Sequence, residues 1–350
     1  VCGYAAYHLS QQNGIRRLAE TGARQLELHT HAVNTEIDTH TYLPSLLELE
    51  SSVLNLLQAP SELRRERVNH YLEGLNTRSG SRVIYVLDSD GRVVATSNWR
   101  DPDSYQGEDL SFRPYFQAAI RGQPGRFYGI GTTTGEPGYY LAHGLRVGDR
   151  IAGVAVVKTR LDPLEQRWER AGLDAYVSDE NGIIILSSNP ARRLKAIRPL
   201  SDKLRAQLAT SLQYHWSKLE ELTILDRQPF GNAQLITLNA SGDTANDAVR
   251  YLAQSSPVNH DKWQFTLLTP VQNVRHEAIV EGLLAAVAVA FLAFLLIALN
   301  ERRKVTAMRL AAREALQQAN SQLERRITER TADLRASNER LRGQSRERTQ

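Results

Sequence analysis

The 350-residue sequence lacks the residues and motifs that mark most metal centres and enzyme active sites. It has one cysteine, Cys2, which excludes a disulfide framework and a thiolate metal cluster within this chain. It has no Gly-x-x-x-x-Gly-Lys phosphate loop, no Gly-x-Ser-x-Gly and no His-Glu-x-x-His. Gly129 and Gly131 are not followed by the third glycine of a dinucleotide site. The sequence therefore contains no recognisable catalytic centre.

The excess of positive over negative charge in the chain is also small. The formal net charge is +4, and the basic residues gather between Arg302 and Arg348. The middle of the chain is close to balance, so its charge does not predict a nucleic-acid partner. The histidines His29, His31 and His40 do not share one helix face, and we expect no metal site there.

One long segment has no polar side chain. Residues 282–299 are apolar throughout, and with the apolar residues just before them they can cross a hydrocarbon core of ~30 Å as a helix. Basic residues begin at Arg302, whereas acidic residues precede the segment. Because positive charge stays on the cytoplasmic side of a membrane, the orientation follows. We predict a transmembrane helix over 278–300, with residues 8–277 outside the cytoplasm and residues 301–350 inside it.

Helical periodicity marks both ends of the chain. Residues 1–7 are apolar and aromatic, and we expect them to be the outer end of a first spanning helix. Apolar residues then recur at three- and four-residue spacing from Ile15 to Ile37, which predicts a long helix within a helical stalk over 8–78. The C-terminal stretch 301–350 has a heptad rhythm with polar interruptions, which predicts a parallel coiled-coil dimer. The heptad positions are Leu316, Leu323, Ile327, Leu334 and Leu341.

An internal repeat lies between these ends. Residues 85–98 align without gaps on residues 176–189, and each copy has a polar turn around a glycine, Gly91 or Gly182. Asp-Gly or Asn-Gly between β-branched runs is a strong hairpin signal. The repeat predicts an α+β fold with two tandem modules of antiparallel sheet. We place the first module at residues 79–165 and the second module at residues 166–275.

Three short motifs in the first module combine cations with hydroxyl groups. They read Ser-Phe-Arg-Pro-Tyr-Phe from Ser111, Gly-Thr-Thr-Thr-Gly-Glu-Pro-Gly-Tyr-Tyr from Gly131 and Val-Val-Lys ending at Lys158. Arg113 offers bidentate recognition of a carboxylate, Lys158 offers a point charge, and the hydroxyl groups can donate further hydrogen bonds. These motifs predict a pocket for a small dianion. The second module lacks them, which suggests that one module binds and the other supports it.

The layout of long helix, two hairpin-bearing modules, one span and a coiled coil resembles the double Cache sensor region of bacterial transmembrane histidine kinases. The three motifs are similar to those of DctB-type C4-dicarboxylate sensors, and residues 327–334 resemble the segment that precedes the kinase core there. Amine- and amino-acid-binding relatives place an aspartate where Lys158 stands. The sequence departs from the expected pattern at Ala142-His143, where a Tyr-Pro-like pair is expected.

The resemblance implies roles for individual residues of this chain. Arg113 and Lys158 are expected to hold the ligand carboxylates. Three threonines would donate to them, one of three tyrosines would close the pocket, and a serine would be a further donor. These residues are Thr132, Thr133 and Thr134, then Tyr115, Tyr139 and Tyr140, and finally Ser111. No metal and no cofactor are expected in this chain.

The expected function is a periplasmic sensor, in the bacterial inner membrane, for succinate, fumarate or malate. It would signal as a homodimer through a kinase core that uses ATP and passes phosphate to a cytoplasmic response regulator; neither the core nor the regulator is encoded here. A 2-oxoglutarate sensor kinase, a chemoreceptor and a diguanylate cyclase with the same external modules stay open as alternatives. A surface enzyme for acidic substrates is disfavoured, because no base or nucleophile pairs with Arg113 and Lys158.

Overall fold

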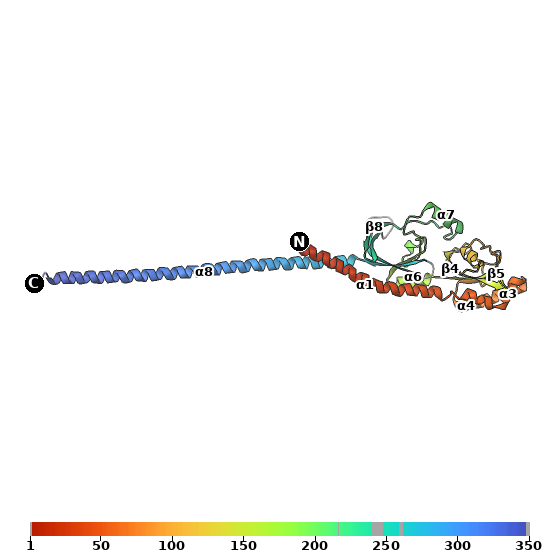
Figure 1. The fold of residues 1–350 in the computed structure, drawn as a ribbon, viewed down its shortest axis with the longest axis horizontal. Coiled ribbons are helices and arrows are strands. Elements are labelled where there is room, and N and C mark those ends of the chain that lie inside the picture. Colours follow the sequence, from red (N-terminus) through yellow and green to blue (C-terminus); the bar gives the residue numbers. More distant parts are fainter. Residues whose placement is uncertain (1, 216, 240–247, 259–261, 348–350) are drawn as a thin grey trace. The chain divides into compact units, whose positions relative to one another are not determined.

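The computed structural model describes residues 2–215, 217–239, 248–258 and 262–347 (Figure 1). The chain forms two compact units. One contains residues 11–276, and the other combines the first ten residues with residues 277–350. The candidate site lies in the unit of residues 11–276.

The chain begins with a long helix, as predicted, and continues in shorter helical segments. The buried residues Ile15, Val33 and Ile37 lie along one stripe of the long helix. Pro44 lies in the first turn of α2, where its missing N–H donor is not needed, and Pro60 lies in the break between α3 and α4. The helical segments are α1 (Cys2–Asp38), α2 (Leu43–Leu46), η1 (Leu47–Leu49), α3 (Ser51–Gln58) and α4 (Glu62–Ser79).

The first module contains a five-stranded antiparallel sheet in the order β2-β1-β5-β4-β3. One face packs against α2, α3 and α4 through residues such as Leu56 and Val157. The opposite face carries an aromatic cluster that the short helix α5 (Pro114–Ala119) covers. The strands are β1 (Val83–Asp88), β2 (Val93–Thr96), β3 (Gly125–Ile130), β4 (Pro137–Val147) and β5 (Arg150–Thr159).

The second module contains a six-stranded antiparallel sheet in the order β7-β6-β11-β10-β9-β8. Helix α6 (Asp162–Arg170) leads into it, and η2 (Pro190–Arg192) and α7 (Asp202–Ser211) follow its first hairpin. The strands are β6 (Asp174–Ser178), β7 (Ile184–Ser187), β8 (Ile224–Phe230), β9 (Ala233–Asn239), β10 (Ala248–Pro257) and β11 (Gln264–Pro270). Two antiparallel sheets in one α+β chain agree with the predicted fold class.

The repeated hairpins have the same local geometry. β1 pairs with β2 and β6 pairs with β7, and the register of each pair shifts at the same repeat position, after Val86 and after Val177. The turn glycines Gly91 and Gly182 have φ of +88° and +80°, which favours glycine. The predicted hairpins are therefore confirmed at both copies of the repeat.

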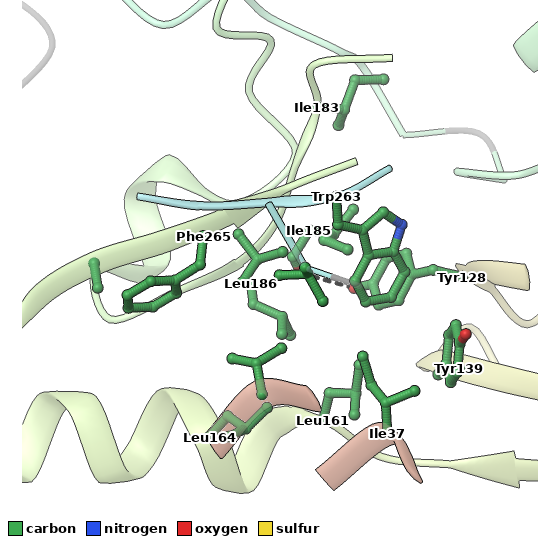
Figure 2. Close-up of a cluster of buried hydrophobic side chains, with 14 of the residues drawn as sticks. Ile37, Tyr128, Tyr139, Leu161, Leu164, Ile183, Ile185, Leu186, Trp263 and Phe265 are labelled. Atoms are coloured by element: carbon green, nitrogen blue, oxygen red, sulfur yellow. Dashed lines mark hydrogen bonds between the residues drawn. The ribbon is translucent and has the colours of Figure 1, made fainter. Parts of the chain in front are cut away.

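A shared hydrophobic core joins the two sheets (Figure 2). Tyr139 of β4 packs edge-on against Trp263, next to β11, with ring centroids 5.2 Å apart. Tyr128 of β3 lies 6.0 Å from the same indole, and its hydroxyl donates to the carbonyl of Ile185 at 2.9 Å. Ile37 of α1 closes this core from the helical side. Burial of this many large side chains makes the modules one packed body.

The last helix, α8 (Gln272–Glu347), runs for 76 residues. Among the described residues it is the one helix long and apolar enough to cross a membrane by length and composition, with a mean hydropathy of 2.9 in its most apolar window. That window is 6% buried by the rest of the chain. The predicted coiled coil lies on the C-terminal part of this helix and stays a prediction, because it concerns a second copy of the chain.

Candidate functional site

Arg113 lies at the N-terminus of α5, on the aromatic face of the first sheet. Its side chain is 2% exposed and its guanidinium makes three hydrogen bonds. Nη2 donates to the carbonyl of Ile130 at 3.0 Å and to Oγ1 of Thr132 at 3.4 Å. Nη1 donates to the carbonyl of Leu212 at 3.2 Å. A guanidinium has five N–H donors, so two remain for a ligand.

Lys158 lies near the end of β5 and is fully buried. Its Nζ donates to the hydroxyl of Tyr105 at 3.2 Å, to Oγ1 of Thr134 at 3.1 Å and to the carbonyl of Glu136 at 3.3 Å. The ring centroid of Tyr140 lies 5.5 Å from the ammonium. The lysine is therefore surrounded by hydroxyl groups, one carbonyl and aromatic faces.

Two glycines make space for the ammonium group. A Cβ on Gly138 would lie 2.5 Å from Cε of Lys158, closer than real Cβ atoms approach other atoms. A Cβ on Gly131 would lie 3.2 Å from Nζ of Lys158 and 3.2 Å from the hydroxyl of Tyr140. The glycines of the second motif thus allow the lysine stem to lie flat on β4.

Four tyrosines form two stacked pairs over this face of the sheet. Tyr85 stacks on Tyr105 with centroids 5.1 Å apart, and Tyr115 stacks on Tyr140 at 5.2 Å. The hydroxyls of Tyr85 and Tyr115 are 2.8 Å apart. Burial raises the pKa of Tyr85, Tyr115 and Tyr140. These phenols therefore stay neutral and act as hydrogen-bond donors.

The two cations have neutral hydrogen-bond partners in the part of the chain that the structure describes. The acidic side chain in the motifs, Glu136, bonds instead to Arg82, with Nε and Oε2 2.9 Å apart. That hydrogen bond is the main cause of the lowered pKa of Glu136, and the charge of Lys158 adds to it. Two buried positive charges without a bonded carboxylate are costly unless an anion meets them. The arrangement is chemically suited to a small dianion.

The structure brings most of the predicted site residues together. Arg113, Lys158, Thr132, Thr134, Tyr115 and Tyr140 all belong to this cluster. The hydroxyl oxygen of Thr133 is buried and has no hydrogen-bond partner among the described residues. It is the middle threonine of the same motif, so it can serve as a donor to a ligand.

Two predicted residues lie elsewhere. Tyr139 points to the opposite face of the sheet, where it packs on Trp263, because successive residues of a strand alternate between faces. Ser111 packs against the hairpin turn, and its backbone N–H donates to Asp109 at 3.0 Å. The Ser111 hydroxyl also bonds that carboxylate and helps to lower the pKa of Asp109. Neither side chain joins the cluster around Lys158.

The structure adds residues to the site that the sequence did not indicate. Tyr105 lies in a loop, and its hydroxyl accepts a hydrogen bond from Nζ of Lys158. Tyr85 of β1 stacks on the ring of Tyr105. The carbonyl of Leu212 reaches Arg113 from the second module. Tyr85 could have been found from the repeat, in which it begins the aligned segment. Leu212 contributes a backbone atom that every residue has, so no sequence signal identifies it.

The family model "Cache domain" matches residues 7–278, which include both sheets. This chain belongs to the Cache domain family. The resemblance to Cache sensor regions that the layout of the chain indicated is therefore confirmed.

Two curated relatives of this Cache chain are called C4-dicarboxylate transport sensor protein DctB. The one from Rhizobium meliloti is 32% identical over 311 residues, which cover 87% of this chain and 48% of the relative. The one from Pseudomonas aeruginosa is 30% identical over 339 residues, which cover 95% of this chain and 51% of the relative. The chain thus spans about half the length of these relatives.

Solved structures agree with the fold. The sensor domain of the Vibrio cholerae histidine kinase DctB superposes with a TM-score of 0.67 at 25% identity, covering 73% of this chain and 98% of that one. The sensory domain of the Campylobacter jejuni chemoreceptor Tlp3, solved with isoleucine bound, gives a TM-score of 0.52 at 13% identity, with 77% and 98% covered. The second likeness supports the fold alone.

Proposed function

We propose that this Cache chain is the extracytoplasmic sensor region of a two-component histidine kinase, which binds a C4-dicarboxylate in its first module and controls uptake of such acids. The observation that carries the proposal is the pair of buried cations, Arg113 and Lys158, whose hydrogen bonds end on neutral oxygens. The names of the DctB relatives support the same ligand class.

The proposed binding mode gives one cation to each carboxylate. A free N–H donor of Arg113 meets one carboxylate through a charge-assisted hydrogen bond, and Nζ of Lys158 meets the other as a point charge. Thr133 and the phenol hydroxyls complete the hydrogen bonds. An amino acid is a poorer ligand, because its ammonium group would face the like charge of Lys158.

The proposed signal passes along α8. Its apolar segment crosses the inner membrane over residues 278–300, with residues 8–277 in the periplasm and residues 301–350 in the cytoplasm. The heptad positions of the cytoplasmic part pair with a second copy of the chain. A kinase core outside this chain then uses ATP and transfers phosphate to a response regulator. The ligand shifts this equilibrium by the difference in its affinity for the two signalling states.

The test is calorimetric titration of the whole chain in lipid nanodiscs. The ligands are succinate, fumarate, malate, 2-oxoglutarate and a panel of amino acids, and the variants are Arg113→Ala and Lys158→Ala. Arg82→Ala is the matched control, because Arg82 is a nearby cation that Glu136 already pairs. We expect diacid binding that both site variants abolish and the control keeps. Amino-acid binding that survives Lys158→Ala would refute the proposal.

The same titration decides the length of the diacid. Ala142, where a bulkier residue was expected, is buried in the aromatic cluster with Tyr115 and Tyr140, whereas His143 turns away to Glu48, with Nε2 3.3 Å from Oε2. This departure from the expected pattern keeps 2-oxoglutarate as the alternative ligand. Tighter binding of 2-oxoglutarate than of succinate would assign the site to the five-carbon acid.

A further inference from the structure

Three residues after α7, Leu212–Tyr214, connect the two modules, and we call them the bridging segment. Leu212 adopts a left-handed backbone conformation with φ of +49°. This conformation is unfavourable for a residue with a branched side chain, so the surrounding contacts must hold it.

The bridging segment bonds the first module through two carbonyl groups. The carbonyl of Leu212 accepts from Nη1 of Arg113 at 3.2 Å. The next carbonyl, of Gln213, accepts from the backbone N–H of Ile130 at 2.8 Å. A Cβ on Gly129 would lie 2.8 Å from that carbonyl oxygen, so this close approach needs glycine. The segment therefore fixes both the guanidinium and the end of β3, whose carbonyl holds Nη2.

The same segment bonds the second module through a buried side chain. The hydroxyl of Tyr214 donates to Oδ2 of Asp179, and the exposed fractions of the two residues are 2% and 4%. The side-chain amide of Gln213 donates to the Tyr214 hydroxyl at 3.3 Å. Asp179 begins the β6–β7 hairpin turn, where Oδ1 accepts from the backbone N–H groups of Asn181 and Ile183.

The internal repeat separates the turn role of this aspartate from its bond to the tyrosine. Asp88 is the equivalent residue in the first module, and its Oδ1 accepts from Asp90 and Arg92 in the same way. The hairpin turn therefore needs one carboxylate oxygen. The second oxygen of Asp179 accepts from the side-chain amide of Asn181 at 3.2 Å and from Tyr214, and the turn does not require the bond to Tyr214. The bond to the bridging segment is an addition specific to the second module.

We propose that the bridging segment is a positioning element of the ligand site, held by the Tyr214–Asp179 bond. It orients the guanidinium of Arg113 for a carboxylate and couples the occupancy of that guanidinium to the second module. The part of the proposal that concerns a carboxylate rests on the proposed function. A carboxylate bound to Arg113 changes the hydrogen bond to Leu212, and the change passes through Tyr214 to the β6–β7 hairpin. By reciprocity, loosening the Tyr214–Asp179 hydrogen bond weakens the binding of the ligand.

The test compares two Tyr→Phe variants of the whole chain in nanodiscs. Tyr214→Phe removes the bond to Asp179, and Tyr128→Phe removes the bond to Ile185, which also joins the two modules from the same core. The first readout is amide hydrogen exchange of the peptide that contains Ile130, measured without ligand. The second readout is the affinity for succinate.

We expect Tyr214→Phe to speed exchange at Ile130 and to weaken succinate binding, each by roughly tenfold, the equivalent of one lost hydrogen bond. Tyr128→Phe should change succinate affinity by no more than about twofold, because Tyr128 does not contact Arg113 through its hydroxyl. In an Arg113→Lys background, Tyr214→Phe should produce no further loss of affinity, because the group that it positions is gone. A purely structural role of Tyr214 would add its loss in that background too.

Equal losses of succinate affinity in the two variants would overturn the positioning role, as would unchanged exchange at Ile130 in Tyr214→Phe. A wild-type chain that binds no diacid would refute the proposed function by itself. The exchange readout needs no ligand, so it still decides the link between Tyr214 and Ile130 in that case. Faster exchange together with unchanged succinate affinity would overturn the coupling to the ligand.

Discussion

The two modules share a hairpin and a sheet but carry different side chains on the same face. Tyr85 and Tyr176 are equivalent, and the register pairs them with Val156 and Thr266. Two residues further along the partner strands, the first module has Lys158 and the second has Leu268, both buried. Opposite these stand Tyr140 and Ala253. A few strand positions therefore turn an apolar face into a cationic one.

This difference shows why a fold alone does not identify a ligand site. Both sheets can build a covered face, but a buried charge on it has a cost that only a matching partner offsets. The first module carries that cost at Arg113 and Lys158. The second module contributes carbonyl groups from its bridging segment instead. The two modules therefore contribute complementary groups to the proposed site.

The largest expected effect comes from replacing Lys158 of the first module by leucine, the residue at the equivalent position of the second module. Lys158→Leu should weaken succinate binding at least ~100-fold, because removing one partner of a buried charge pair costs several kcal/mol. The thermal midpoint of the ligand-free chain should not fall, since an uncompensated buried charge is removed. Calorimetry and circular dichroism melting measure the two effects. Lys203→Leu, at an exposed lysine of α7, is the control and should leave affinity unchanged.

A smaller effect follows from the space that the lysine needs. Gly138→Ala should weaken succinate binding by roughly tenfold, because the added methyl group displaces Lys158 from Thr134 and Tyr105 and costs about one hydrogen bond. Gly74→Ala is the matched control, since its Cβ would meet no atom closer than 3.4 Å. Equal affinities in both variants would mean that Lys158 does not set the binding energy.

Much of this comparison could be predicted from the sequence. The hairpins were predictable because Gly91 and Gly182 follow strand-like runs at equivalent positions, and backbone conformation there depends on local residues. The two cations were predictable because Arg113 and Lys158 stand in apolar surroundings, where an isolated charge needs a reason. Local sequence carries both signals.

The remaining features depend on long-range packing. The choice between Tyr139 and Tyr140 follows from strand alternation, but only once the face of β4 is known. Tyr105 reaches Lys158 from a loop, 53 residues away in the chain. The carbonyl of Leu212 meets Arg113 across 99 residues, and a carbonyl has no sequence signature. Such contacts are fixed by the packing of the two modules together.

The pH dependence of stability should also distinguish the modules. Burial raises the pKa of Asp179, so the folded chain holds that proton more tightly than the unfolded chain. Its contribution to the free energy of unfolding is greatest below the ordinary pKa of 3.8 and is lost as the pH rises through the folded pKa. The wild-type advantage over Asp179→Asn should therefore shrink as the pH is raised from about 4 to about 7 in melting experiments. Asp88→Asn, which changes the equivalent turn, is the control; the same trend there would contradict the assignment to Asp179.

The smallest expected effect is the difference between removing the hydroxyl of Tyr85 and removing that of the equivalent Tyr176. Tyr85→Phe leaves the buried hydroxyl of Tyr115 without its 2.8 Å partner and should lower the free energy of unfolding by about 1 kcal/mol. Tyr176→Phe should cost about half as much, because its partner Thr266 keeps a hydrogen bond to Ser255 at 2.9 Å. Only Tyr85→Phe should also weaken succinate binding, since Tyr115 stacks on Tyr140 beside Lys158. Melting and calorimetry of both variants test this order, and a larger loss of affinity in Tyr176→Phe would place the ligand in the second module.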